Sequence, residues 1–317
     1  MDTKVSIIIL NWNGLENTTQ CLESLKKTIY PNYEVIVVDN GSTHDDAQVL
    51  KERFSDYIHL IENDRNYGFA EGNNIGMRYA LNNSRPDYIL LLNSDTVVNP
   101  EFLTELVKAA ETDNRIGSCQ SKILSLKDQK FIDAVGIGIN KYGCACQMGY
   151  AEKDNGQYET MTEVFGACAA SALYRTETLK QIGLFDEDFF AYYEDVDLSW
   201  RARLFGWKCI YVPTSLVHHI HSATGFSIKA YFLARNEIFY VLKNAPLSNV
   251  LLHICRLMLS IPVLMFAGLV GREHKSRFIK LRGKLAALSN IPRMLKKRRG
   301  IQSARLIKNS ELSRWFK

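Results

Sequence analysis

A chain of 317 residues with 46% hydrophobic and 23% charged residues has the composition of an ordinary globular protein, which excludes large-scale disorder. The net charge of +5 is unevenly distributed: residues 241–317 contain 17 Lys and Arg but only 2 Asp and Glu, whereas the first 240 residues contain 22 and 32. This asymmetry predicts an acidic globular body and a basic region that binds an anionic partner, either a membrane surface or a nucleic acid.

The first third of the chain alternates short apolar segments with helical patterns. Strands are predicted at 5–10, 34–38, 57–61 and 88–92, and helices at about 15–28 and 69–82. Continuous apolar strands that alternate with helices favour the α/β class, with a parallel sheet covered by helices. No GxGxxG follows the first strand and no GxxxxGK[ST] occurs, so neither a dinucleotide fold nor a P-loop is supported.

Polar residues follow three of these strands. They are Asn11 and Asn13, Asp39 and Asn40, and Asn93 and Asp95. Ligands of open α/β sheets bind beyond the carboxyl ends of the strands, so these residues are candidates for a nucleotide site. Asp39 suits either a nucleoside contact or an ordinary turn. Asp95 could hold a divalent cation.

A glycine- and asparagine-rich segment, DRNYGFAEGNN at 64–74, opens the second predicted helix. Its candidate ligand-binding residues are Asn66, Gly68, Asn73 and Asn74. Glycine permits close approach of a ligand to the backbone, and a helix start offers free N–H groups to an anion. Ordinary helix capping by asparagine explains the same pattern.

The middle of the chain combines strand and helix signals. An irregular hairpin region is predicted at 131–150. Residues 165–175 are predicted to form a strand of small residues, which could approach a ligand closely. A helix from about Asp195 to Phe205 and then a strand follow. The acids Glu194, Asp195 and Asp197 stand at this helix start, where either capping or a general base would use them. Three histidines follow the strand, and they are either surface residues or metal ligands: His218, His219 and His221. The alternation of side chains along a strand places His219 and His221 on one face.

The C-terminal region has a different character. A helix is predicted at 227–243, and the apolar segment 250–270 contains His253, Arg256 and Pro262. Only 257–270 lacks ionisable groups, which is shorter than the roughly 20 residues of a spanning helix, so an interfacial or re-entrant helix is expected. Basic clusters follow, as an anionic membrane surface would select. A core helix with a solvated basic tail is the alternative.

Two further sequence features bear on the compartment. The seven cysteines include no CxxC and no repeated zinc-ligand spacing, and Cys144-x-Cys146 is the closest pair, which favours buried thiols in a reducing compartment. The opening MDTKVSIIIL lacks the basic segment of a secretory leader.

Taken in order, the motifs resemble family-2 glycosyltransferases, especially the rhamnosyltransferase-like branch. The matching segments are VSIIILNWNG, VIVVDNGS, NYGFAEGNNIGM, YILLLNSDTVV, GACAASALYR, FFAYYEDVDLSWRARLFGW, HHIHSAT and ARNEIFYVLKN, which cover about residues 4–245. The resemblance implies a GT-A fold, a Rossmann-like mixed sheet flanked by helices. We therefore expect a catalytic domain at 1–225, with a nucleotide-sugar half at about 1–115 and an acceptor half at about 116–225. The composition adds the expectation of a helical, basic, membrane-associated region at 226–317.

The resemblance also implies roles for individual residues. Asp195 matches the catalytic base, with Glu194 and Asp197 as its supports. Asp95 matches the acid of the DxD-like metal motif, which here is Asn93-Ser94-Asp95 with a single carboxylate, and His219 matches the histidine of an H-x-x-S segment. The donor site would comprise Asn11, Asn13, Asp39, Asn40, Asn66, Gly68, Asn73, Asn74 and Asn93, with Arg235 and Asn236 contacting diphosphate or acceptor.

The implied activity is that of an inverting enzyme of cell-surface polysaccharide synthesis. It would use Mg²⁺ or Mn²⁺ to transfer a sugar from dTDP-rhamnose or a UDP-sugar to a hydroxyl of a glycan or lipid-linked saccharide. We expect a peripheral enzyme at the cytoplasmic face of the membrane and no nucleic-acid partner, because the cations of KKRRG have no interleaved aromatic residues. A sugar-1-phosphate nucleotidyltransferase and a noncatalytic membrane-binding nucleotide-sugar protein remain alternatives.

Overall fold

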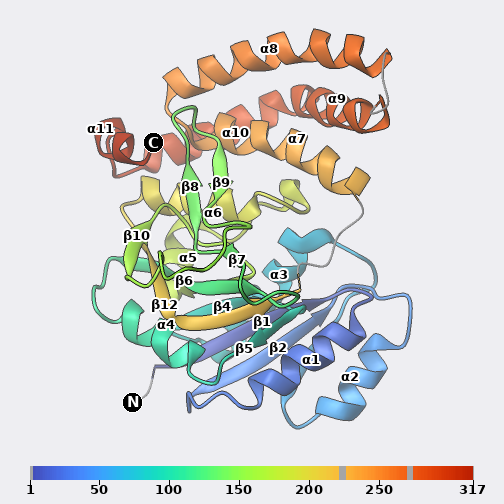
Figure 1. Ribbon diagram of the computed structural model, residues 1–317, viewed down its shortest axis with the longest axis vertical. Coiled ribbons are helices and arrows are strands. Elements are labelled where there is room, and N and C mark those ends of the chain that lie inside the picture. Colours follow the sequence, from blue (N-terminus) through green and yellow to red (C-terminus); the bar gives the residue numbers. More distant parts are fainter. Residues whose placement is uncertain (1–2, 221–225, 270–273, 317) are drawn as a thin grey trace.

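The computed structural model describes residues 3–220, 226–269 and 274–316. Over these residues the chain forms a mixed, ten-stranded sheet with helices on both faces, and further helices stack beyond one side (Figure 1). The strand order is β10-β12-β6-β11-β4-β1-β2-β3, with β5 on β12 and β7 on β6. The expected mixed sheet flanked by helices is therefore confirmed.

The N-terminal half is a parallel sheet, as predicted. It contains β1 (Val5–Asn11), β2 (Tyr33–Asp39), β3 (Ile58–Glu62) and β4 (Tyr88–Asn93), with α1 (Leu15–Leu25), α2 (Asp46–Phe54) and α3 (Gly68–Tyr79), which a π-helical turn (Ala80–Ser84) extends. Alternate residues of β1 enter different cores: Ile7 packs with Leu22 of α1, and Ile8 packs with Met77 of α3. Burial on both faces explains why the strands are continuously apolar.

The remaining strands complete the sheet with mixed directions. They are β5 (Thr96–Val98), β6 (Ile116–Ser125), β7 (Ile132–Ala134), β10 (Thr162–Val164), β11 (Ser171–Arg175) and β12 (Lys208–His219). Strand β11 is antiparallel to both β4 and β6, and β12 is parallel to β6. The hairpin predicted within 131–150 is present as β8 (Ile137–Ile139) and β9 (Ala145–Gln147).

The predicted strand at 165–175 is regular only in its second half, β11. Before it, Gly166 lies so close to α6 that a Cβ atom would overlap the side chain of Ser199. The small residues thus allow this segment to pack against the protein's own helix. The helices of this half are α4 (Phe102–Ala110), α5 (Thr176–Ile182) and α6 (Glu194–Leu204), with a 3₁₀ turn at Glu187–Phe189.

The C-terminal region is helical. It comprises α7 (Phe226–Asn244), α8 (Leu247–Leu269), α9 (His274–Ser289), α10 (Ile291–Ala304), α11 (Asn309–Leu312) and a 3₁₀ turn at Ser313–Trp315. One hydrophobic core joins Trp200 and Leu204 of α6 to Ile238 of α7 and Met294 of α10. This core contains residues from both sides of position 225, and the division into two domains there stays a prediction.

Helix α8 is the outermost layer of the molecule (Figure 1). It is 23 residues long, and among the described residues it is the one helix long and apolar enough to cross a membrane. The sequence-based expectation that this segment is too short to span is thus wrong on length, since the helix begins at Leu247. Only 17% of the window Leu247–Leu264 is buried, and Met258, Leu259 and Val263 are largely exposed.

Candidate active site

The carboxyl ends of β1, β2 and β4 meet at one edge of the sheet. Asn11 is paired in register with Asp39, and Leu10 with Asn93. The Asn11 amide donates to Asp39 Oδ1 at 2.7 Å and to Asp46 Oδ2 at 3.0 Å, and it is fully buried. Asp39 also accepts hydrogen bonds from the backbone and hydroxyl of Ser42. Asn11 thus orients Asp39 within a network that closes the loop after β2.

The asparagines predicted to contact the donor brace neighbouring loops. Asn13, with a left-handed φ of 50°, accepts from the Thr43 backbone N–H at 2.8 Å. The buried Asn40 donates to Asn66 Oδ1 at 3.0 Å and accepts from the Tyr67 N–H at 3.2 Å. These bonds hold the three loops against one another at the sheet edge.

The start of α3 contacts the loop before α6. Gly68 has a φ of 85°, and a Cβ there would lie 2.6 Å from the Phe190 carbonyl oxygen. Asn74 exchanges two hydrogen bonds of 3.0 Å with the Phe185 backbone, and Asn73 donates to the Phe69 carbonyl within its own helix. The close approach that Gly68 permits is thus made by the protein itself, and it joins the two halves of the site.

His219 and Asp95 are brought together by strand pairing. Residue 219 of β12 lies opposite Thr96 of β5, which places its ring beside Asp95. The Nε2 atom is 3.0 Å from Asp95 Oδ1 and 3.3 Å from the Asn93 amide nitrogen, while Nδ1 is 2.7 Å from Asp133 Oδ2. Burial opposes a positive charge on His219, but the hydrogen bonds to Asp133 and Asp95 outweigh it and raise the pKa to about 9.

These residues suit a divalent cation. Asp95 supplies a carboxylate oxygen and His219 an imidazole nitrogen, which are common ligands of divalent metals. Asp133 on β7 would hold the Nδ1 proton and so orient Nε2 toward Asp95, where a metal would displace the Nε2 proton, an arrangement typical of metal-ligating histidines. His218, half-buried on the other face of β12, has its pKa lowered by burial, and His221 lies outside the described residues.

Asp133 was not singled out from the sequence. It sits in the short segment FIDAVG and is only 5% exposed. An acid between apolar residues is a signal that a partner exists, but only the pairing of β7 with β6 identifies that partner as His219.

Asp195 lies in the first turn of α6. Its Oδ2 accepts from the Ala169 backbone N–H at 3.2 Å, and its Oδ1 accepts from the N–H of Val196 at 2.8 Å. Burial raises the pKa of Asp195 in spite of these hydrogen bonds. Burial and the charge of Asp195 raise the pKa of Glu194 well above its usual range, and Glu194 Oε2 has no hydrogen-bond partner among the described residues. Two adjacent carboxyls with raised pKa values are suited to share and transfer a proton.

Cys168 lies between the two parts of the site. Burial raises the pKa of its thiol, and the charges of Asp195, Asp133 and Glu194 raise it further. Cys168 also packs with Ala134, the neighbour of Asp133, and the next N–H in the chain, that of Ala169, donates to Asp195, so acids of α6 and β7 lie on either side of one residue.

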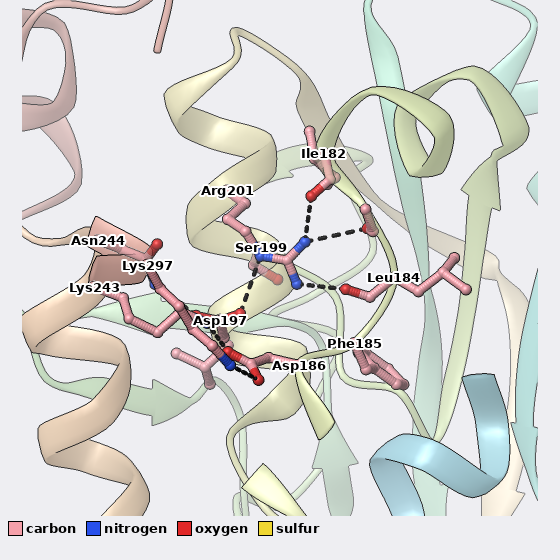
Figure 2. Close-up of polar contacts among 12 residues, drawn as sticks. Ile182, Leu184, Phe185, Asp186, Asp197, Ser199, Arg201, Lys243, Asn244 and Lys297 are labelled. Atoms are coloured by element: carbon pink, nitrogen blue, oxygen red, sulfur yellow. Dashed lines mark hydrogen bonds and ion pairs between the residues drawn. The ribbon is translucent and has the colours of Figure 1, made fainter. Parts of the chain in front are cut away.

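Asp197 has different surroundings, as Figure 2 shows. Its carboxylate binds Arg201 Nε at 3.0 Å, Lys243 Nζ at 2.7 Å and the Asn244 amide at 2.7 Å, and it is fully buried. The i+4 pairing with Arg201 was predicted. Lys243 also binds Asp186, so Asp197 belongs to a network that joins α6 to α7, and no contact with Asp195 supports its predicted role beside the base.

The same network uses charge from the basic C-terminal region. Lys297 of α10 binds both Asp186 and Asp188, and Arg293 binds Asp188. Part of the positive charge that was assigned to a membrane surface is therefore neutralised within the protein.

Arg235 and Asn236 on α7 support the loop that leads to Asp195. The Asn236 amide donates to the carbonyls of Phe189, Ala191 and Tyr192 at 2.7–2.9 Å, and Arg235 Nη2 donates to the carbonyls of Asp188 and Phe189. In this loop Phe190, Tyr192 and Tyr193 have left-handed φ angles of 61–69°. Such strained conformations persist only when the surroundings impose them, and Asn236 provides that constraint.

The fold and this arrangement of acids define the class of the protein, and the sequence comparison confirms it. The sequence model of glycosyl transferase family 2 matches residues 6–183, more than half of the chain, and the chain belongs to this family. It is therefore a glycosyltransferase, which decides against the nucleotidyltransferase and the noncatalytic alternatives.

Two curated relatives illustrate the family. Rhamnosyltransferase WbbL of Escherichia coli K12 is 29% identical over 266 residues, which cover 77% of this chain and 95% of the relative. The low-salt glycan biosynthesis hexosyltransferase Agl10 of Haloferax volcanii is 28% identical over 204 residues, 63% of this chain and 61% of that protein. The chain thus spans less than two thirds of the second relative.

Solved structures share the fold. A mannosyltransferase from Pyrobaculum calidifontis, solved with GDP-mannose and Mn²⁺, has a TM-score of 0.54 at 14% identity, and the match covers 98% of this chain and 79% of that one. GalNAc-T7, solved with UDP, GalNAc and Mn²⁺, has a TM-score of 0.59 at 15% identity, covering 76% of this chain and 50% of that one.

Proposed function

We propose that this glycosyltransferase transfers a sugar from dTDP-rhamnose or a UDP-sugar to a hydroxyl of a glycan or lipid-linked saccharide, with inversion at the anomeric carbon. The observation that carries the proposal is that two acidic sites lie on either side of Cys168. One is the hydrogen-bonded chain Asp95–His219–Asp133 at the sheet edge, and the other is the partly buried Asp195 at the start of α6. The similarity to the rhamnosyltransferase WbbL supports a deoxysugar donor.

The protein's own groups have distinct tasks in this proposal. Asp39, held by Asn11 and Ser42, would face the nucleoside, and Asp95 with His219 would hold Mg²⁺ or Mn²⁺ against the diphosphate. The bound ion would offset the charge that develops on the departing nucleoside diphosphate. Asp195, whose raised pKa makes it a stronger base than an ordinary aspartate, would accept the proton of the attacking hydroxyl.

Glu194 completes the proposed catalytic set. Its carboxyl is buried beside Asp195 and its pKa is raised further by that charge, so it would remain protonated while Asp195 is ionised. Asp197 is left out of the set because Arg201, Lys243 and Asn244 occupy its carboxylate.

We further propose that the enzyme binds the cytoplasmic face of the membrane through α8 and α9. A cavity of about 460 Å³ between the two helices has apolar walls that include Leu259 and Val263, and the cations Arg256, Lys280 and Lys284 line it. Apolar side chains next to positive charge suit the boundary between acyl chains and anionic headgroups.

The test is a screen of nucleotide sugars with and without Mn²⁺, followed by proton NMR of the disaccharide formed on a lipid-linked or synthetic acceptor. We expect metal-dependent transfer from one deoxysugar or hexose donor, with the product anomeric configuration opposite to that of the donor. A product that retains the donor configuration would contradict the role given to Asp195, because direct attack with a single base inverts the centre.

A further inference from the structure

A second group of metal-ligating side chains lies outside the site described above. Cys144, just before β9, Glu237 of α7 and His253 of α8 each point one ligand atom at a common point, and these atoms lie within 4.8 Å of one another. Glu237 Oε1 is 3.2 Å from Cys144 Sγ and 4.0 Å from His253 Nε2.

His253 is the buried member of this group, whereas Cys144 and Glu237 are partly exposed. His253 is only 9% exposed, and its Nδ1 is buried without a hydrogen-bond partner among the described residues. The Tyr240 hydroxyl accepts from the Ala145 backbone N–H at 2.9 Å, which fixes the hairpin beside Cys144. The other ring nitrogen, Nε2, faces the Glu237 carboxylate at 4.0 Å, which is longer than a hydrogen bond, so a metal ion between them would give both atoms a partner.

The separations agree with a tetrahedral metal site. Zinc binds sulfur at about 2.3 Å and nitrogen or oxygen at about 2.0–2.2 Å, so neighbouring ligand atoms stand roughly 3.3–3.8 Å apart. The Cys144–Glu237 and Glu237–His253 separations, 3.2 and 4.0 Å, bracket this range, and the third is no more than 4.8 Å, so small side-chain rotations would close the site.

The ligand types decide which metal fits. A thiolate and an imidazole favour zinc over the hard cations Mg²⁺ and Mn²⁺, which prefer oxygen. The thiolate of Cys144 and the carboxylate of Glu237 would together balance the charge of a divalent ion. Arg256, whose guanidinium is 3.9 Å from Cys144 Sγ, is placed to donate to the thiolate from outside the coordination sphere.

We propose that Cys144, Glu237 and His253 bind one Zn²⁺ ion, with water in the fourth position, and that this ion fastens the β8–β9 hairpin to α7 and α8.

The test measures zinc binding by the full-length protein after chelator treatment, in competition with a chromophoric zinc indicator. We expect tight binding of one ion per chain, and a loss of affinity of at least about 100-fold in Cys144→Ser and in His253→Gln, since loss of outer-shell partners alone costs 10–100-fold. Cys146→Ser, which removes an exposed thiol two residues away, and Cys255→Ser on α8 are matched controls that should bind as the wild type does.

Two additional measurements make the result decisive. Cobalt loaded in place of zinc should give a sulfur-to-cobalt charge-transfer band that Cys144→Ser abolishes and Cys146→Ser keeps. Zinc should raise the melting temperature of the wild type and not that of Cys144→Ser, because only binding to the folded state stabilises it. Cys144 is partly exposed, so this variant should fold even where the buried His253→Gln does not.

The proposal is overturned by either of two outcomes. One is that the wild-type protein binds zinc no more tightly than Cys144→Ser does. The other is an equal loss in Cys146→Ser, which would show that zinc binds scattered thiols. Asp95→Ala separates this site from the diphosphate site, since it should keep zinc binding whatever happens to donor binding.

Discussion

The Asp195→Asn substitution tests whether Asp195 is the general base while Asp197, two residues further along the same helix, stabilises the fold. Asp195 accepts two backbone N–H groups, one on each oxygen, from Ala169 and Val196. Asparagine has a single acceptor oxygen, so one of these N–H groups loses its partner and faces an amide NH₂ group. The cost of an unsatisfied buried group is about 1–3 kcal/mol.

A second effect opposes this loss. The pKa of Asp195 is raised because its charge is poorly solvated, and the neutral amide removes that penalty. The two effects partly cancel, so the free energy of unfolding should change by no more than about 2 kcal/mol. Transfer, in contrast, should fall by about 10²–10⁴-fold, the usual contribution of a general base, which equals roughly 3–5 kcal/mol of the barrier.

Asp197→Asn is the matched control in the same turn of helix. Asp197 is fully buried between the cations Arg201 and Lys243, and removal of its charge leaves both cations undercompensated. Breaking a buried ion pair costs about 3–5 kcal/mol, so the melting temperature should fall well below that of Asp195→Asn. The folded fraction should still transfer sugar within about tenfold of the wild-type rate, which is less than a lost general base costs.

The assay combines three measurements on each variant: thermal unfolding, calorimetric binding of the nucleoside diphosphate with Mn²⁺, and initial rates of sugar transfer below the melting transition. Nucleotide affinity should be unchanged in Asp195→Asn, because none of its contacts involves the sheet edge. Turnover close to wild type in Asp195→Asn, or a folded but inactive Asp197→Asn, would refute the division of roles between the two acids.

Further predictions address the other parts of the site. Asp95→Ala should abolish the Mn²⁺-dependent part of nucleotide binding while leaving the melting temperature of the metal-free enzyme within a few degrees, and calorimetry that finds unchanged affinity places the ion elsewhere. Because the raised pKa of Asp195 keeps it protonated to higher pH, kcat/KM should decline on acidification from above the ordinary aspartate value of about 3.9, and a profile flat down to that value contradicts the raised pKa. Asn236→Ala removes three hydrogen bonds to the loop before α6, so it should lower kcat with little change in nucleotide affinity, and an unchanged kcat means that the loop holds its shape unaided. Leu259→Asp on the exposed face of α8 should reduce flotation with anionic vesicles, with the exposed Leu306→Asp outside α8 as control, and equal flotation of both variants counts against α8 as the membrane-binding element.

The local elements and the order of motifs were predictable from the sequence, because they depend on interactions between near neighbours. The apolar runs of β1, β2 and β4, each ended by polar residues, predicted a parallel sheet with a polar edge, and the register of Asn11 with Asp39 confirms it. The acids of YYEDVD predicted the start of α6. These signals are local, and strand burial or helix capping produces them directly.

The orientation of each acid required the tertiary structure. Asp195 and Asp197 are two residues apart, so they stand about 200° apart around a helix and face opposite sides. Which side is the site and which is the interior depends on where α7 packs, because Lys243 and Asn244 arrive from that helix. Periodicity separates the two residues, but it does not assign their roles.

What the sequence by itself determined is the family, the strands and helices that carry the motifs, and the residue types at the sheet edge. What only the tertiary structure decided is which residues meet. Asp133 becomes the partner of His219 because β6 pairs with both β7 and β12, and Cys144, Glu237 and His253 converge from a hairpin and two helices. No spacing rule links such residues, because their distance along the chain is unrelated to their distance in space once long-range packing has closed the fold.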